Sequence, residues 1–362
     1  MKSMKVIVIF SLILSVSISA FLCMQPKYKI DTNHAKKAEE KLNNKTKKEN
    51  SKKSEPISNT KTFKISAAGD CTIGWDTNFA YGNRFDKVFK DNNEDYKYFF
   101  KNVLPIFKDD DITYVNLEGT FTNNNVKVEK RFNFKSPPSF VNVLKEGNVE
   151  VVGVANNHTY DYGNEGFNET KDTLDNANID YFGYDKYLIK EVNGIKVGFF
   201  GLIDIMGVKY KEINKAIQYL KDNNCDLIIA AMHWGIEKDY NQSNEQIKMG
   251  HYMIDHVVDL VLGSHPHVIQ GIEKYNDKYI VYSLANFVFG GNSNPSDKDT
   301  FIFQQTFTFK DNNLVLDDNI KVIPASISST NKFNNYQPTP ATGERYEKIK
   351  NKILSKSVNF SF

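Results

Sequence analysis

Short apolar runs alternate with segments of helical periodicity between residues 63 and 283. The apolar runs predict strands at 63–68, 111–116, 149–154, 195–201, 226–232, 259–262 and 279–283. The segments between them predict helices at about 97–108, 138–146, 164–177, 211–223 and 243–257. Strands that alternate with helices in this way are typical of α/β proteins, so we predict an α/β domain.

The pattern changes after residue 300, where aromatic and polar residues alternate up to Phe309. Asp311-Asn312-Asn313 separates this run from a second apolar run, so an antiparallel hairpin is expected to close the sheet. Asn193-Gly194 predicts a tight type I′ hairpin turn earlier in the chain. We place the folded domain at 62–326 and expect 327–362 to be a peripheral tail.

The N-terminus has the features of a targeting segment. Lys2 and Lys5 precede an uncharged apolar run from Val6 to Leu22. Residues 1–24 are therefore expected to be an uncleaved signal anchor, with a cleaved signal peptide as the alternative. The first alternative places an extracellular domain on the cell membrane, and the second gives a secreted protein.

Charge is distributed unevenly, although the formal net charge of the chain is only +2. Residues 25–61 hold 11 Lys and five acidic residues with few apolar ones, which predicts a disordered linker. The chain after residue 61 has 33 basic and 39 acidic residues, a balance of −6. A nucleic-acid partner is not indicated, because such proteins gather basic residues on one face of the fold.

Polar residues that can bind a metal or move a proton follow three predicted strands. Asp70 follows the first strand, and Glu118 comes two residues after the second. Asn156, Asn157 and His158 follow the third, with Asp161 close behind. In open α/β sheets ligands bind beyond the carboxyl ends of the strands, so these positions predict a functional site.

Histidines follow two further strands. His233 comes two residues after the apolar run 227–231. His265-Pro266-His267 comes directly after Leu262-Gly263-Ser264. Neutral imidazole is the commonest side-chain metal ligand. The five strand ends together predict one polar cleft with several nitrogen and oxygen donors.

The order of these motifs resembles the CapA-type poly-γ-glutamate capsule proteins, which are related to calcineurin-like metallophosphatases. The segments that carry the resemblance are Ala68-Gly69-Asp70, Asn116-Leu117-Glu118-Gly119, Ala155-Asn156-Asn157-His158, His233-Trp234-Gly235-Ile236-Glu237, Gly263-Ser264-His265-Pro266-His267-Val268 and Tyr282-Ser283-Leu284-Ala285-Asn286-Phe287. The resemblance implies a metallophosphatase-like two-sheet α/β sandwich.

The resemblance also implies roles for particular residues. The implied metal ligands are Asp70, Glu118, Asn157, His233, His265 and His267. His158 and Asp161 would have catalytic roles, and Asn156, Trp234, Glu237 and Asn286 would orient ligands or contact substrate. Mixed oxygen and imidazole donors fit Mn, Fe or Zn, with one or two ions bound.

Two departures from the metallophosphatase pattern keep alternatives open. Those enzymes have Asp-x-His in the first motif, where this chain has Asp70-Cys71-Thr72, and Glu118 replaces an Asp in the second. The sequence is therefore compatible with three kinds of site: a two-metal site, a single-metal site and a polar cleft without metal.

The resemblance implies an exported, membrane-anchored protein of poly-γ-glutamate capsule synthesis or export. Its site would belong to a metal-dependent hydrolase of phosphoesters or amides. Alternatively, the protein is a non-catalytic accessory or scaffold. The implied partners are membrane-embedded capsule synthase subunits, the polymer itself and the membrane through the N-terminus.

Overall fold

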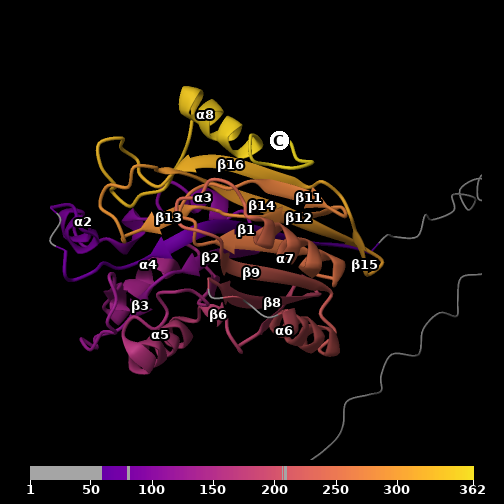
Figure 1. Cartoon of the computed structure of the whole chain (residues 1–362), viewed down its shortest axis with the longest axis horizontal. Coiled ribbons are helices and arrows are strands. Elements are labelled where there is room, and N and C mark those ends of the chain that lie inside the picture. The colour runs from indigo at the N-terminus through magenta and orange to yellow at the C-terminus, as the bar shows by residue number, and fades with distance from the viewer. Residues whose placement is uncertain (1–58, 80–81, 206, 208–209) are drawn as a thin grey trace, which may run out of the picture. The chain divides into compact units, whose positions relative to one another are not determined.

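The computed structural model describes residues 59–79, 82–205, 207 and 210–362. The predicted signal anchor and all but the last three residues of the predicted linker lie outside the described residues. The described residues form one compact unit, built from two large sheets and their covering helices (Figure 1). The predicted mixture of sheets and helices is therefore confirmed.

The first sheet has nine strands, and it is part parallel and part antiparallel. The order across it is β17 (Thr339–Pro340), β16 (Ile320–Ser326), β14 (Asp299–Lys310), β1 (Thr60–Thr72), β2 (Ile112–Leu117), β5 (Val151–Gly153) and β6 (Asp180–Phe182). β13 (Asn286–Phe289) also pairs with β1, and β15 (Asn313–Val315) pairs with β14. β1, β2, β5 and β6 run parallel, whereas β14 is antiparallel to β1. The predicted hairpin after residue 300 is confirmed as β14 and β15.

The second sheet has six strands. Their order is β11 (Ile272–Tyr275), β12 (Lys278–Val281), β10 (Leu260–Ser264), β9 (Leu227–Trp234), β8 (Ile195–Asp204) and β7 (Leu188–Val192). β8, β9, β10 and β12 run parallel. The predicted turn between β7 and β8 is confirmed, because Asn193 and Gly194 have φ values of 53° and 72°. A separate two-stranded sheet joins β3 (Thr120–Phe121) to β4 (Lys135–Ser136).

Helices connect the parallel strands. The α-helices are α2 (Phe85–Asp91), α3 (Leu104–Phe107), α4 (Val141–Glu146), α5 (Gly163–Ala177), α6 (Tyr210–Asp222), α7 (Asn244–Asp255) and α8 (Gly343–Leu354), and the 3-10 turns are η1 (Tyr96–Tyr98) and η2 (Pro138–Phe140). Ser243 begins α7 through a reciprocal capping box with Gln246. Four of the five predicted helices are present, with ends shifted by a few residues.

Alternation along the strands divides the core into layers. Leu227 and Ile229 of β9 pack between the two sheets, while Ile228 and Ala230 pack under the helices of the second sheet. The outer face of the first sheet buries Val115 and its neighbours against α4 and α5. The two sheets therefore pack face to face, with helices outside them.

The predicted helix at 97–108 is wrong. Only η1 and the four-residue α3 form in this region. Pro105 has no N–H, and its ring would clash with the carbonyl four residues earlier if the helix extended upstream. It is accommodated because it lies in the first turn of α3, where the N–H is not needed.

The prediction of a peripheral C-terminal tail is also corrected. α8 lies along β16 (Figure 1), and its Ile349 and Ile353 are fully buried in the core between the sheets. Tyr336, also fully buried, packs on Phe85. The tail is rich in polar residues, but these two isoleucines lie four residues apart and give α8 an apolar stripe.

No helix within the described ranges is long and apolar enough to cross a membrane. The apolar run at residues 6–22 lies outside those ranges.

Candidate metal and active site

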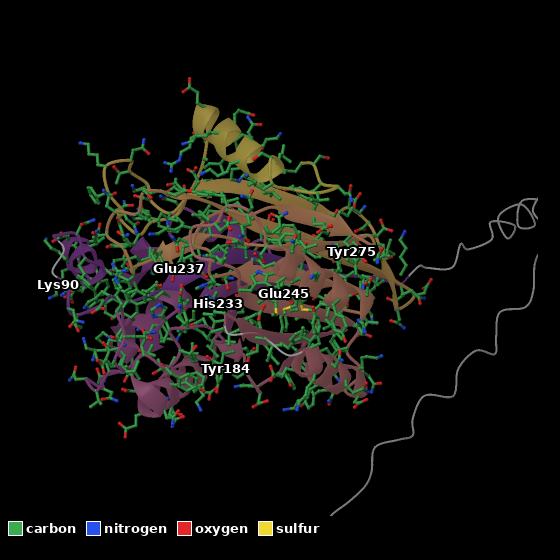
Figure 2. The ribbon with its side chains drawn as sticks, in the orientation of Figure 1. Lys90, Tyr184, His233, Glu237, Glu245 and Tyr275 are labelled. Carbon is green, nitrogen blue, oxygen red and sulfur yellow. The ribbon has the colours of Figure 1, made fainter. Side chains whose placement is uncertain are left out.

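The carboxyl ends of the two parallel strand sets meet at one place. Asp70 at the end of β1 is in register with Asn116 of β2 and Asn286 of β13. In the other sheet, His233 at the end of β9 is in register with Ser264 of β10. Figure 2 labels His233 and the exposed Glu237, each of which has a ligand atom within 4.8 Å of a ligand atom of His265.

Asp70 joins the two sheets. Its Oδ1 accepts a hydrogen bond from Asn116 Nδ2 (2.8 Å), and its Oδ2 accepts one from His265 N (3.3 Å). His267 Nδ1 lies 3.2 Å from the same Oδ2. Asp70 is fully buried, so its position is fixed by these contacts rather than by water.

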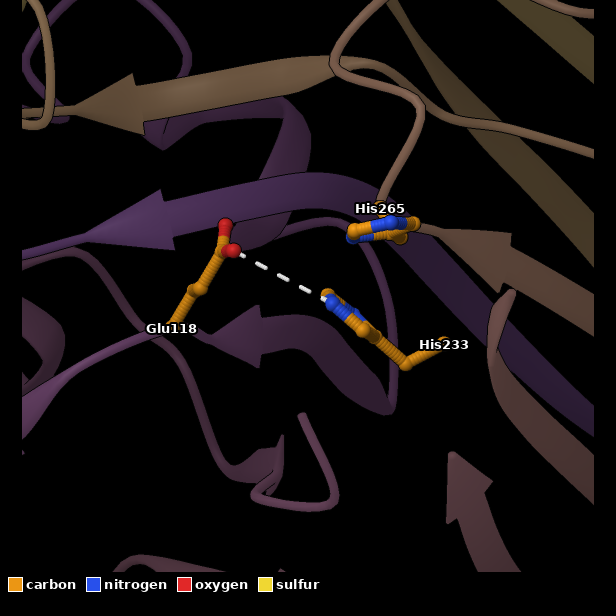
Figure 3. A group of neighbouring side chains, drawn as sticks. All are labelled: Glu118, His233 and His265. Atoms are coloured by element: carbon orange, nitrogen blue, oxygen red, sulfur yellow. Dashed lines mark ion pairs between the residues drawn. The ribbon is translucent and has the colours of Figure 1, made fainter. Parts of the chain in front are cut away.

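Glu118 points its carboxylate into a group of imidazoles. Its Oε1 lies 3.7 Å from His267 Nε2, 3.9 Å from His158 Nε2 and 4.0 Å from His233 Nε2. Figure 3 shows it opposite His233 and His265. Glu118 is fully buried, and neither of its carboxylate oxygens has a hydrogen-bond partner in the described structure.

His265 and His267 are held in an uncommon backbone conformation. Their φ values are 97° and 58°, in the region that side chains other than glycine rarely adopt. Such conformations cluster at functional sites. His265 Nδ1 is buried without a hydrogen-bond partner in the described part of the chain, whereas His267 Nδ1 is 2.8 Å from Asn286 Oδ1.

Burial and neighbouring charges set the protonation of this cluster. Burial lowers the pKa of His265 to about 4 and holds the pKa of His233 well below its ordinary value. Burial also raises the pKa of Glu118 to about 8. Burial by itself would lower the pKa of His267. The negative charges of Glu118 and Asp70 outweigh this effect and raise that pKa.

His233 is positioned by three polar neighbours. Its Nε2 is 3.0 Å from Asn157 Oδ1, and its Nδ1 is 3.1 Å from Ser264 Oγ and 3.4 Å from Asn116 Nδ2. A cation bound through Nε2 requires that nitrogen to be unprotonated, with the hydrogen on Nδ1 facing Ser264. Each tautomer has an acceptor: Asn157 Oδ1 for a hydrogen on Nε2, and Ser264 Oγ for a hydrogen on Nδ1. The ring can therefore bind a metal through Nε2 while Ser264 still holds it in place.

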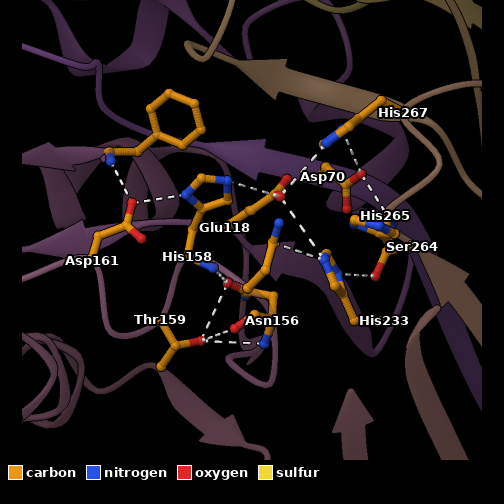
Figure 4. A network of polar contacts seen from close by, with 12 residues as sticks. Asp70, Glu118, Asn156, His158, Thr159, Asp161, His233, Ser264, His265 and His267 are labelled. Atoms are coloured by element: carbon orange, nitrogen blue, oxygen red, sulfur yellow. Dashed lines mark hydrogen bonds and ion pairs between the residues drawn. The ribbon is translucent and has the colours of Figure 1, made fainter. Parts of the chain in front are cut away.

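His158 forms a second line of contacts beside the cluster (Figure 4). Its Nδ1 donates to Asp161 Oδ2 (2.8 Å), since a carboxylate can only accept, and its Nε2 faces Glu118. Lys130 forms an ion pair with Asp161 and donates to Asn157 O (2.9 Å). Burial lowers the pKa of His158, so the ring is neutral with a free Nε2 lone pair.

The structure brings most of the predicted site residues together. Asn156 is buried, donating to Asn116 Oδ1 and Leu117 O, so it supports the second strand end. Asn286 lies against His267. Glu237 is exposed but has an oxygen within reach of His265 and His267.

Trp234 does not belong to the cleft. It is fully buried under the helices of the second sheet, and its Nε1 donates to Tyr282 O (2.8 Å). Successive residues of a strand face opposite sides, so Trp234 points away from the side that His233 occupies. The predicted contact of Trp234 with ligand or substrate is therefore corrected.

Three supporting residues were not among the predicted site residues. Asn116 and Ser264 lie inside the strand-end motifs, where alternation along the strand could have selected them. Lys130 comes from the long connection between β3 and β4, which has no periodicity. No signal in the sequence assigns it to this site.

The donors fit a metal ion. Three sets of side chains have ligand atoms within 4.8 Å of one another: Glu118, His233 and His265; Glu237, His265 and His267; and Asp70, Glu118 and His267. A buried carboxylate and a buried imidazole nitrogen without partners are costly unless a cation or proton compensates them. The groups that need a partner are therefore the groups that bind divalent metals.

Residues 64–291, more than half of the chain, match the family described as bacterial capsule synthesis protein PGA_cap. The chain belongs to this family. The match covers all five strand ends and stops before β14, so the family region contains the whole cluster.

Three relatives support this assignment. The chain is 30% identical to the PGA biosynthesis protein CapA of Bacillus subtilis (52% of this chain, 56% of that protein) and 31% identical to the capsule biosynthesis protein CapA of Bacillus anthracis (53% and 54%). It is 25% identical to a probable polyglutamine synthesis accessory protein of Mycobacterium tuberculosis (49% and 55%). The chain spans about half the length of these relatives.

Proposed function

We propose that this protein acts in the synthesis or export of poly-γ-glutamate capsule, as an exported and membrane-anchored protein with a metal-dependent hydrolase site. Family membership and the names of the two Bacillus relatives support the process. The membrane-embedded synthase subunits and the polymer are the proposed partners. The likeness to metallophosphatases suggests a phosphoester or an amide as the bond that is cleaved.

The observation that carries the hydrolase proposal is the Glu118 carboxylate. It is fully buried without a hydrogen-bond partner among the described residues and faces the imidazoles of His158, His233 and His267. A structural glutamate would accept hydrogen bonds from the backbone or from side chains. Without a metal ion, burial raises the pKa of Glu118 to about 8, so the group keeps its proton at neutral pH, and a bound cation would take the place of that proton.

The proposed chemistry divides between the metal and the protein. A bound Mn, Fe or Zn ion would supply Lewis acidity and lower the pKa of a bound water. Glu118, His233, His265 and His267 would hold the ion with Asp70, and Asn157 would support His233. His158 Nε2 can accept a proton, because Asp161 holds its Nδ1–H and burial keeps the ring neutral.

One observation favours a non-catalytic accessory protein as the second candidate. Thr72 stands where metallophosphatases have the histidine of Asp-x-His, and its hydroxyl is buried with no partner in the described residues. A threonine hydroxyl is a weaker ligand than imidazole, so the cluster would have fewer strong donors for a second ion. The Mycobacterium relative is itself named an accessory protein. In this alternative the domain holds the synthase or the nascent polymer.

Metal content and activity of the purified full-length chain test both candidates. His265→Ala combined with His267→Ala should abolish metal binding and, if the site is catalytic, hydrolysis of phosphoesters or of γ-glutamyl polymer. His256→Ala is the matched control, because His256 is exposed at the end of α7 and contacts the carbonyl and the ring of Tyr252 instead of the cluster.

Capsule production in cells separates the outcomes. Loss of metal together with loss of capsule and hydrolysis supports the hydrolase. Loss of metal with normal capsule favours the accessory function. Unchanged metal content in the double variant would refute the metal site itself.

A further inference from the structure

A charged cleft lies beside the metal-site loops. It has a volume of about 670 Å³ and is formed by α8, the segment that enters β14, and the ring of Tyr240. Its walls include Lys298, Arg345, Lys348 and Lys352. None of these residues belongs to the His and carboxylate cluster, so the cleft is a separate feature of the fold.

α8 presents its cations in a row. Arg345, Lys348 and Lys352 follow each other at spacings of three and four residues, which places them on one side of the helix. With a rise of about 1.5 Å per residue, these positions are about 5 and 6 Å apart along the helix axis. Ile349 and Ile353 anchor another side of α8 in the core, so the row faces outward from a fixed helix.

Two of these cations are held by acids of the opposite wall. Lys352 Nζ lies between Asp297 (3.1 Å) and the largely buried Asp299, and Arg345 reaches Asp299 at 3.5 Å. Arg345 also donates to Asn331 Oδ1 (2.8 Å). These contacts fix the shape of the wall and neutralise most of the acidic charge of the cleft.

Four cations and three acids line the cleft, the third acid being Glu344, and two of the lysines form no ion pair within the described part of the chain. Lys348 is exposed and makes no polar contact with the described part of the chain, and Lys298 donates to the neutral carbonyl of Pro295 (3.1 Å). The chain after residue 61 has a balance of −6, which repels polyanions in general. A cleft with free lysines is therefore a favourable place on this domain for an anionic chain.

The cleft also lies close to the cluster. An oxygen of Glu237 is within 4.8 Å of nitrogens of His265 and His267, and Tyr240 follows only three residues later. Three residues span at most about 11 Å. Lys238 N donates to Pro266 O (2.8 Å), and Tyr240 OH donates to Asp297 (2.9 Å), so the loop is tied to both places.

The geometry points to the cleft as a binding site for the carboxylates of a flexible anionic polymer, which it holds next to the metal cluster. This inference rests on the proposed function for the identity of the polymer, poly-γ-glutamate. A chain with carboxylates at regular intervals can meet Lys298 and the row on α8 at several points. Its next residues then reach the loop of His265 and His267.

Binding of poly-γ-glutamate of defined length to the purified full-length chain tests the site. Lys348→Glu with Lys298→Glu should weaken binding about three- to tenfold at low salt, as expected for two charge contacts at the surface, one exposed and one half-buried, that become repulsive. Higher salt should reduce the difference, because surface charges are screened. Lys350→Glu is the matched control, since it lies on the same helix and does not line the cleft.

Equal affinity of the double variant and the wild type for the polymer would refute the proposed binding site. A control variant that weakens polymer binding as much as the double variant would also refute it. Absence of binding by the wild type at low salt would also overturn it. His265→Ala combined with His267→Ala should lose metal yet keep the affinity for polymer, so a failed metal site and a failed cleft give different results.

Discussion

Glu118 is a buried carboxyl group that accepts no hydrogen bond from the described residues, which makes its contribution to stability dependent on pH. Its pKa is raised from 4.5 to about 8, so the cost of ionising it in the folded state is absent below about pH 4.5 and complete above about pH 8. Glu118→Gln removes this cost but also removes a metal ligand. In chelator, the variant should gain on the order of 1–3 kcal/mol over the wild type at pH 8–9, and little at pH 5.

Urea unfolding at the two pH values measures this difference, and metal content measured on the same samples should fall. A variant less stable than the wild type at both pH values would show that Glu118 makes favourable contacts in the metal-free protein, contrary to its proposed role. Asp180→Asn, a half-exposed acid on the edge strand β6, is a control for the loss of a single negative charge.

Lys130 compensates the fully buried Asp161. Lys130→Met keeps the length of the stem but leaves the carboxylate with only His158 and the Phe134 N–H. We expect a loss of about 1–3 kcal/mol in the free energy of unfolding, the range for hydrogen bonds to charged groups. Lys130→Arg retains the charge and should lose less.

Denaturant unfolding of these two variants at neutral pH checks the prediction. Equal stabilities of the Lys130→Met variant and the wild type would mean that the loop is anchored by Asn133 and Val128 alone, which also bond to the backbone of Asp161.

At this scale the sequence predicted side chains that end strands, because the carboxyl ends of parallel strands meet at one edge. This rule selected Asp70, Glu118, His233, His265 and His267, whose side chains lie together in the structure. Lys130 could not be, because it reaches the site from an irregular loop. Trp234 was misassigned because adjacency in sequence to His233 means opposite faces in a strand.

The helix α8 is the element whose part in the hydrophobic core was least apparent from the sequence. Its Ile349 is fully buried and packs in the core between the sheets. Ile349→Ala should therefore lower the free energy of unfolding by about 2–5 kcal/mol, as large-to-small changes in cores do. Glu347→Ala, on the exposed side of the same helix, should change it by less than about 0.5 kcal/mol.

Thermal or urea unfolding of the two variants measures the contrast. Similar small effects for both would restore the view of the tail as peripheral. The tail was misjudged because a polar composition dominates residues 327–342, and only two apolar positions mark the buried stripe of α8.

Strands were predicted more reliably than helices for a physical reason. Buried parallel strands are continuous apolar runs, which stand out in the sequence. The false helix at 97–108 has apolar residues at helical spacing, but Pro105 interrupts it. Short edge strands such as β17 are only two residues long and carry no periodicity.

For the whole molecule, the proposed export makes a topological prediction. Lys2 and Lys5 precede the apolar run and should stay inside the cell, so residues 63–362 should lie outside. Lys332→Cys, placed at an exposed position in a background that carries Cys23→Ser and Cys225→Ser, should react with a membrane-impermeant maleimide in intact cells. Labelling only after lysis would contradict the proposed orientation. The background without the new cysteine is the control, since it retains only Cys71, which is buried.

The pairing of β1 with β14 has a consequence for the order in which the domain can assemble. Thr60 is in register with Lys310, so one side of the first strand stays open until nearly all of the domain has been synthesised. Contacts so distant in sequence slow folding, and an open strand edge invites association with other chains. A nascent or translocating chain would therefore expose β1 for most of its passage. Chaperones that shield strand edges should raise the yield of this protein more than they would raise that of a protein built from local hairpins.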